Sequence, residues 1–280
     1  HKRILAVKST TDLMNPLRYF YIPLLMLMGV ALLLTAQDSV KFGWLPIPIM
    51  VAIALVYMFG PQIKWWYWGK YPPDLSSRYA PLLDRFPFYL SLGPAQKRDF
   101  RAKAFLFRAN TVYKAMAMPR VPEDIQVFLA ASAACIFSGI EEPDYDKADV
   151  VVAYPHPFPS PQIEALHRSE FFARDGVLIF SVPDLVQSVV EPASFIQLGL
   201  YEYARVFLAE YGRLGFPSLN WEQIEEISAF KQQPAEKWHG SGTLDVTAVS
   251  LVLYFTHKNK FESTFPEVFS ELTSELNRSF

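Results

Sequence analysis

Two uncharged apolar runs near the start of the chain constrain its fold more than any other feature. Residues 19–36 and 44–60 contain no Asp, Glu, Lys or Arg, and a short loop connects them. Crossing the hydrocarbon core of a bilayer as a helix takes roughly 17–25 apolar residues. An aromatic cluster follows the second run at residues 65–68, and Trp and Tyr gather where hydrocarbon meets lipid headgroups. The runs therefore predict a transmembrane two-helix hairpin; the alternative is a pair of buried core helices in a soluble domain.

Basic residues flank this pair of runs and predict its orientation. Lys2, Arg3, Lys8 and Arg18 precede the first run, and Lys64, Lys70 and Arg78 follow the second. The loop between the runs holds only Lys41, which is opposed by Asp38. An excess of Lys and Arg marks the cytoplasmic side of a membrane. We therefore expect both termini and everything after the second run to face the cytoplasm. Because the runs hold no ionisable residue, they predict an anchor rather than an ion path.

Composition excludes several classes of function. The chain is 51% hydrophobic and 19% charged, whereas an ordinary soluble domain has about 25% charged residues. The net charge of −2 leaves no basic excess for binding nucleic acid. The single cysteine, Cys135, excludes an internal disulfide and a cysteine-based zinc cluster. No Gly-rich phosphate loop and no G-x-S-x-G motif occurs, so we expect no cofactor.

The sequence divides into an anchor, residues 1–72, and an α+β domain, residues 73–280, separated by Pro72 and Pro73. Apolar periodicity predicts helices at 93–118, 122–137, 192–211, 221–230, 244–257 and 266–277. Runs of β-branched residues predict strands at 149–154 and 177–182. The Pro-rich residues 154–161 are expected to form an edge segment or a loop, and residues 231–242 an unstructured linker.

Several of these segments, in this order, are similar to those of a known family. They are FPFYLSLGPAQKRDFRAKAFLF, PEDIQVFLAASAACIFSGI, VVVAYPHPF, GVLIFSV, LYEYARVFL and DVTAVSLVLYF, followed by FPEVFSEL. Residues 86–277 resemble the Mlc titration factor A family of bacterial cytoplasmic zinc peptidases. The resemblance implies a zincin-like fold for the domain. The two-helix anchor lies outside the usual family pattern.

The family's catalytic positions are altered in this sequence. The family helix that matches residues 200–207 carries H-E-x-x-H, in which two imidazoles one turn apart share a zinc ion and the Glu polarises its water. Here Tyr201 and Arg205 stand at the histidine positions, and Glu202 remains. The family's third ligand, a Glu, matches Asp245, and a tyrosine that assists catalysis matches a position at or beside Trp238. The resemblance therefore implies a degenerate site.

These replacements predict that no metal is bound and that no residue is catalytic. Arg205 keeps its charge and repels a cation, and the neutral phenol of Tyr201 is a poor ligand. A substitute ligand, His239, follows Trp238 and leaves open a rearranged zinc site. We favour the interpretation that Arg205 replaces the metal charge by pairing with Asp245 or Glu202. The vacant site would then be a structural cluster of ion pairs.

The predicted function is that of a catalytically inactive, peptidase-like scaffold or accessory subunit in the bacterial inner membrane. Its expected partners are membrane lipid, through the anchor, and another membrane or cytoplasmic protein. The candidates for binding that protein by strand addition are Tyr154, His156 and Phe158. Two alternatives remain: an active metallopeptidase with a rearranged zinc site, and a regulator that recruits a cytoplasmic protein. The isolated histidines, His156, His167 and His257, are expected at a surface or interface.

Overall fold

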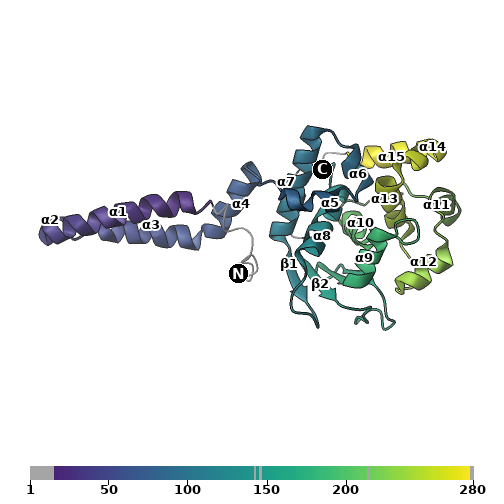
Figure 1. Cartoon of the computed structure of the whole chain (residues 1–280), viewed down its shortest axis with the longest axis horizontal. Coiled ribbons are helices and arrows are strands. Elements are labelled where there is room, and N and C mark those ends of the chain that lie inside the picture. Colours follow the sequence, from purple (N-terminus) through teal and green to yellow (C-terminus); the bar gives the residue numbers. More distant parts are fainter. Residues whose placement is uncertain (1–15, 142, 145–146, 213–214, 278–280) are drawn as a thin grey trace. The chain divides into compact units, whose positions relative to one another are not determined.

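The fold consists of two compact units. A computed structural model of the chain describes residues 16–141, 143–144, 147–212 and 215–277 (Figure 1). The units are His1–Pro73 and Asp74–Phe280, so the division falls one residue after the expected boundary. Lys2, Arg3 and Lys8, on which the predicted orientation partly rests, lie outside the described residues.

The first unit is a helical hairpin with an apolar surface. It contains α1 (Arg18–Gln37), the short α2 (Ser39–Phe42), α3 (Pro46–Met58) and α4 (Gly60–Lys70), and α1 packs against α3 (Figure 1). Apolar side chains on both long helices are exposed, as Leu33 (69%) and Met50 (59%) illustrate. By length and composition, Arg18–Gln37 and Ser39–Met58 are able to cross a membrane. Within this unit these side chains are not covered, which favours the transmembrane hairpin over a pair of buried core helices.

The second unit is an α+β domain built on a small mixed sheet. Its strands are β1 (Val112–Ala115), β2 (Val150–Tyr154), β3 (Ser169–Phe172) and β4 (Val177–Ser181). Their order is β1-β2-β4-β3, with β1, β2 and β4 parallel and β3 antiparallel to β4. The two strands predicted from their β-branched residues, β2 and β4, are confirmed. They form the centre of the sheet, where such residues pack on both faces.

Both outer strands were absent from the sequence prediction. The helix expected over residues 93–118 ends as α7 (Pro94–Asn110), and β1 follows it. This part of the prediction is wrong because β1 pairs with β2, from Val112 opposite Val150 to Ala115 opposite Ala153. Tertiary pairing therefore overrides the helical periodicity of this segment. The other outer strand, β3, is four residues long and contains Glu170, so no strand pattern marked it.

Two further segments differ from expectation. The helix expected over residues 192–211 begins only at Leu198, as α10 (Leu198–Tyr211), and a separate helix, α9 (Val182–Val190), precedes it. The supposed linker over residues 231–242 contains α12 (Gln232–His239). Gln, Ala, Glu and Lys in this segment favour a helix, and Pro234 falls in the first turn, where its missing N–H leaves no hydrogen bond unmade.

Three helices form the centre of the domain. They are α8 (Glu123–Ile136), α10 and α13 (Val246–Thr256); α10 packs against α8, α13 and β3, and all three have mostly buried side chains. The helices predicted at 122–137, 221–230, 244–257 and 266–277 are confirmed. Further helices of the domain are α5 (Ala80–Leu83), α6 (Pro87–Ser91), α11 (Trp221–Ser228), α14 (Lys258–Thr264) and α15 (Pro266–Leu276).

A lysine on α7 holds the end of the central helix α8. The Lys103 ammonium donates to the carbonyl oxygens of Phe137 (3.0 Å), Ser138 (3.1 Å) and Ile140 (2.6 Å). Lys103→Met should lower the free energy of unfolding by about 1–3 kcal/mol, because these carbonyls lose their donor. Chemical unfolding of the full chain measures the effect, and Arg98→Met on the exposed face of α7 is the matched control. Equal stability of the two variants would contradict this role.

The same interaction should depend on pH. Burial lowers the pKa of Lys103 to about 8, with Asp99 and Glu141 acting in the opposite direction. An unfolded lysine has a pKa of about 10.4, so between these values the unfolded chain binds more protons than the folded chain. The advantage of the wild type over Lys103→Met should therefore increase as pH rises from about 8 to about 10.4.

Candidate functional site

The residues that the sequence singled out lie where α10 packs against β3 and α13. Tyr201 and Glu202 are buried in the middle of α10, and Arg205 follows one turn later with its side chain 32% exposed. Glu202 faces β3, because its carboxylate contacts Ser169 at the start of that strand. The end of α12 brings His239 to the same place, 37 residues along the chain from Glu202.

The Glu202 carboxylate is the centre of a buried hydrogen-bond network. Its Oε2 accepts from Arg205 Nη1 at 2.9 Å, and its Oε1 accepts from Ser169 Oγ at 2.7 Å. Ser169 Oγ also lies 2.9 Å from His239 Nε2, and His239 Nδ1 lies 2.6 Å from Ser241 Oγ. With the proton of the imidazole assigned to Nε2, every contact in this chain joins one donor to one acceptor. We call these five residues the Glu202 network.

Arg205 keeps the buried carboxylate ionised. Burial by itself would raise the pKa of Glu202, but the charge of Arg205, together with His239 and Ser169, holds that pKa below its ordinary value. Burial likewise opposes the charge of Arg205, and Glu202 and Tyr201 raise the pKa of the guanidinium above its ordinary value. Of the two partners that the sequence left open for Arg205, Glu202 forms the ion pair.

Asp245 has a different role from the one considered for it. Its carboxylate is exposed at the start of α13 and accepts from the backbone N–H groups of Thr247 (2.9 Å) and Ala248 (3.2 Å). Its own N–H donates to the Tyr201 hydroxyl at 3.0 Å. The proposal of an Arg205–Asp245 pair is therefore corrected: Asp245 caps a helix, where a side-chain oxygen satisfies N–H groups that have no partner within the helix.

Trp238 is not part of the Glu202 network, but its neighbour is. The indole of Trp238 packs against the Phe195 ring at 4.6 Å, and the Arg168 guanidinium lies 5.3 Å from the Trp238 ring centroid. His239, which the sequence suggested only as a substitute metal ligand, contributes the imidazole. Sequence reasoning missed Ser169 altogether, because a lone serine on an unrecognised strand carries no motif.

The arrangement does not fit nucleophilic catalysis. With the imidazole proton assigned to Nε2, Ser169 donates its proton to Glu202 and accepts from His239, whereas an activated serine donates to the imidazole. Ser169 and Glu202 are both 0% exposed and His239 is 1% exposed, so a substrate has no access to them. Within the part of the chain that the structure describes, no three His, Cys, Asp or Glu side chains come together as a metal site. The contacts within the network are hydrogen bonds and one ion pair, which join β3, α10 and the end of α12.

A second buried pair lies near the first. His167 Nε2 is 3.1 Å from Glu170 Oε2, His167 Nδ1 is 2.9 Å from the carbonyl oxygen of Ala165, and both side chains are at most 2% exposed. The expectation of a surface position is therefore wrong for His167, because its imidazole is held between a carboxylate and the Phe158 ring, 4.5 Å away. His156 is exposed and His257 half-buried.

The proposed partner-binding segment is largely occupied by the chain itself. Phe158 is buried, and its backbone exchanges two hydrogen bonds of 3.0 Å with His167. Tyr154 ends β2, which already pairs with strands on both sides. Strand addition at Phe158 is therefore corrected, since the backbone groups it requires are already paired. Of the three candidates, His156 has an exposed side chain.

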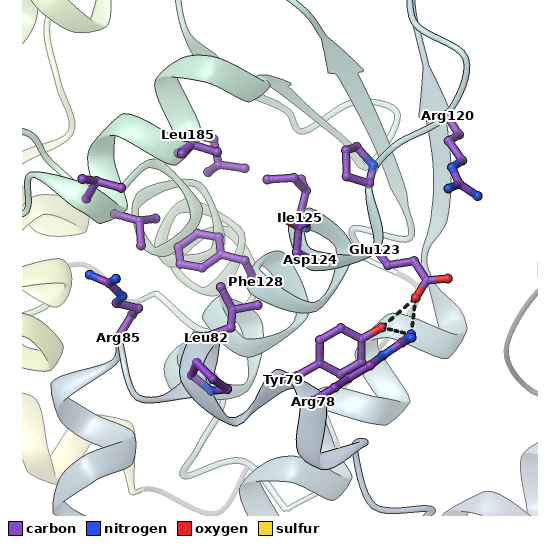
Figure 2. A pocket seen from close by; sticks show the side chains of 15 residues that line it. Arg78, Tyr79, Leu82, Arg85, Arg120, Glu123, Asp124, Ile125, Phe128 and Leu185 are labelled. Carbon is purple, nitrogen blue, oxygen red and sulfur yellow. Dashed lines mark hydrogen bonds and ion pairs between the residues drawn. The ribbon is translucent and has the colours of Figure 1, made fainter.

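A cavity of about 890 Å³ opens elsewhere on the domain, between the segment around α5, the start of α8 and α9 (Figure 2). Apolar side chains form its floor: Leu82, Ile125, Phe128, Leu185 and Val189. Arg78, Tyr79 and Glu123 bond to one another on one side, with Tyr79 Oη 2.7 Å from Glu123 Oε2. We call this cavity the α8–α9 groove; no sequence motif indicated it.

Comparison with known proteins adds no assignment to this geometry. No protein-family model matches the chain, and no curated protein matches it. The resemblance to a zinc peptidase family therefore stays a prediction that rests on the segments that suggested it.

Proposed function

We propose that the chain is a membrane-anchored, non-catalytic relative of the Mlc titration factor A peptidases that binds a protein partner at the membrane. The observation that supports this is the state of Glu202: its carboxylate is 0% exposed, and its two oxygens accept from Arg205 and Ser169. A Glu that activates water in a metallopeptidase has to contact that water and stand beside the metal. Here the Glu202 carboxylate instead forms an ion pair with a fixed cation, the guanidinium of Arg205.

The anchor in this proposal is the α1–α3 hairpin, and the membrane is the bacterial inner membrane. Apolar side chains cover the outside of both helices, and α1 and the uncharged residues 44–60 each have a length that fits a bilayer. The short connection at Ser39–Phe42 holds one lysine, Lys41, paired with Asp38 at 3.4 Å. Basic residues elsewhere flank the hairpin, so the proposed orientation places both termini and the second unit in the cytoplasm.

The orientation is tested by single-cysteine labelling in cells. Val40 lies in the connection and is 94% exposed, so a thiol at Val40→Cys should react with an impermeant maleimide added from outside. A thiol at Ser263→Cys, exposed on the second unit, should react only after the membrane is permeabilised. Cys135 is buried and serves as the unreactive background. The reverse pattern would contradict the orientation.

The absence of peptidase chemistry is tested with zinc and with Glu202→Gln. Purified full chain should contain well under one zinc per molecule, and chelators should not change its stability. Glu202→Gln keeps the shape of the side chain and should leave function in the cell largely intact, whereas it removes the water-activating base of an active enzyme. Stoichiometric zinc that is lost together with peptidase activity on chelation would refute the proposal.

The binding function itself is tested by isolating the wild-type chain in mild detergent. A stable complex with a membrane or cytoplasmic protein, identified by mass spectrometry and reproduced with purified components, is the expected result. A chain that purifies alone at native expression levels would refute the scaffold function.

A further inference from the structure

The α8–α9 groove has an apolar rim that is open to solvent. Val186 (43% exposed) and Val190 (59% exposed) project from α9 beside the buried Leu185, so one helix contributes both floor and rim. Exposed apolar side chains gathered around a hollow mark a binding surface more often than isolated ones do. Because the groove is open, a ligand in it keeps one side in water. An amphipathic helix satisfies that requirement, whereas the alkyl chain of a lipid does not.

Charges at the rim define the ligand further. Arg85 and Arg120 are exposed, come from different loops and lie at opposite sides of the groove (Figure 2). Neither has an ion-pair partner among the described residues, whereas Arg78 is paired with Glu123. Asp124, between them in the view, contributes a negative charge near the middle. The pattern of positive, negative and positive charge is complementary to a ligand with acidic groups toward its ends and none at its centre.

From these features we infer that the α8–α9 groove binds an amphipathic helix of a partner protein whose acidic residues lie near both ends. The inference rests on the proposed function and specifies the chemistry of the partner. The apolar face of the helix packs on Leu82, Val186 and Val190, and the acidic side chains near its ends pair with Arg85 and Arg120. A helix of about two to four turns is the usual size of such ligands.

A pair of synthetic peptides tests the charge pattern. Both are fluorescent amphipathic helices of about 14 residues with leucines at i, i+3, i+4 and i+7; one has Glu and the other Lys in its first and last turns. The full chain is presented in phosphatidylcholine nanodiscs, and binding is followed by fluorescence anisotropy. The Glu peptide should bind about tenfold more tightly than the Lys peptide, and Arg85→Glu combined with Arg120→Glu should reverse that preference.

Matched apolar variants test the location. Val190→Asp should weaken binding of the Glu peptide about tenfold, whereas Leu166→Asp, at a side chain that is 63% exposed outside the groove, should not. Both positions are exposed, so neither change disturbs the core. Equal affinity for the two peptides, a preference that survives the charge reversal, or equal effects of the two Asp variants would overturn the inference.

The natural occupant is identified by a photo-crosslinking residue at position 190 in cells. Attachment to an acidic-ended helix of another protein supports the inference; attachment to lipid, to a second copy or to the chain's own N-terminal segment overturns it. The two proposals can fail separately. If the complex of the wild type persists in Val190→Asp, the inference about the groove is overturned and the scaffold function is not. If the chain has no partner at all, the scaffold function is overturned, whichever peptide the groove prefers.

Discussion

Arg205→Ala should lower the free energy of unfolding of the domain by about 3 kcal/mol at pH 7, one of the two largest effects that we expect. The change leaves the carboxylate of Glu202 buried without its cation, and breaking a buried ion pair in this way typically costs about 3–5 kcal/mol. The one-third exposure of Arg205 places the expected value at the low end. Chemical unfolding of the full chain in detergent, followed by near-ultraviolet circular dichroism, measures it.

A second substitution should recover part of this loss. In the double variant Arg205→Ala with Glu202→Gln no buried charge is left, so its stability should exceed that of Arg205→Ala alone. Asp245→Ala should not rescue Arg205→Ala, because Asp245 caps α13, and losing a cap costs about 1 kcal/mol. If Arg205→Ala unfolds like the wild type, the Glu202 network does not depend on its cation.

The same variant should have an altered pH dependence. In the wild type the pKa of Glu202 lies below its ordinary value, so its contribution to stability is present above about pH 4.3 and is lost as pH falls through the folded-state pKa. In Arg205→Ala burial dominates and raises this pKa. The stability of the variant should then decrease as pH rises from about 4.3 toward the raised pKa, and the difference from the wild type should grow over that interval.

Gly240→Ala is the second change with a large expected effect. Gly240 ends α12 with φ +87°, a backbone conformation that favours glycine, and an added Cβ would lie 2.3 Å from the carbonyl oxygen of Leu166. The strain and the displaced backbone together should cost about 2–5 kcal/mol. The clash would also separate the end of α12 from the segment before β3, where the Arg168 N–H donates to the His239 carbonyl oxygen at 3.0 Å.

A neighbouring glycine isolates the steric part of this effect. Gly242 has φ +91° and nothing within 4 Å of an added Cβ, so Gly242→Ala should cost only about 1–2 kcal/mol of backbone strain. Hydrogen exchange should show faster opening around Ser169 and His239 in Gly240→Ala but not in Gly242→Ala. Similar melting temperatures of the two variants would contradict the predicted clash with the Leu166 carbonyl oxygen.

The sequence predicted those parts of the fold that local patterns specify. The central helix α8 and the strands β2 and β4 have continuous apolar or β-branched runs, which remain visible without tertiary context. The short outer strands β1 and β3 do not, because pairing with a neighbour, not composition, makes them strands. The residues of α12 resemble a linker for a related reason, because this polar helix has few apolar positions.

The site was predictable only where its residues are close in sequence. Glu202 and Arg205 are three positions apart on one helix, a spacing that brings side chains together, and this pair is present. Ser169 and His239 reach Glu202 through contacts between distant segments, which no local pattern encodes. The role predicted for Asp245 was wrong because it came from matching this residue to a metal ligand of the family. Its position immediately before a helix, where Asp is a common cap, predicts the role that is observed.

The sheet order has a consequence for the sequence of folding events. The antiparallel strands β3 and β4 pair from Phe172 opposite Val177, so their contacts close a very short loop, whereas parallel pairing of Val112 with Val150 closes a much longer one. Closure entropy increases with loop length, and long-range pairing forms more slowly. We therefore expect the β3–β4 hairpin to form first and to dock onto β2 afterwards. Ser169 lies at the start of β3, so we expect its hydrogen bond to the Glu202 carboxylate, which removes that oxygen from water, to form only after the hairpin has closed.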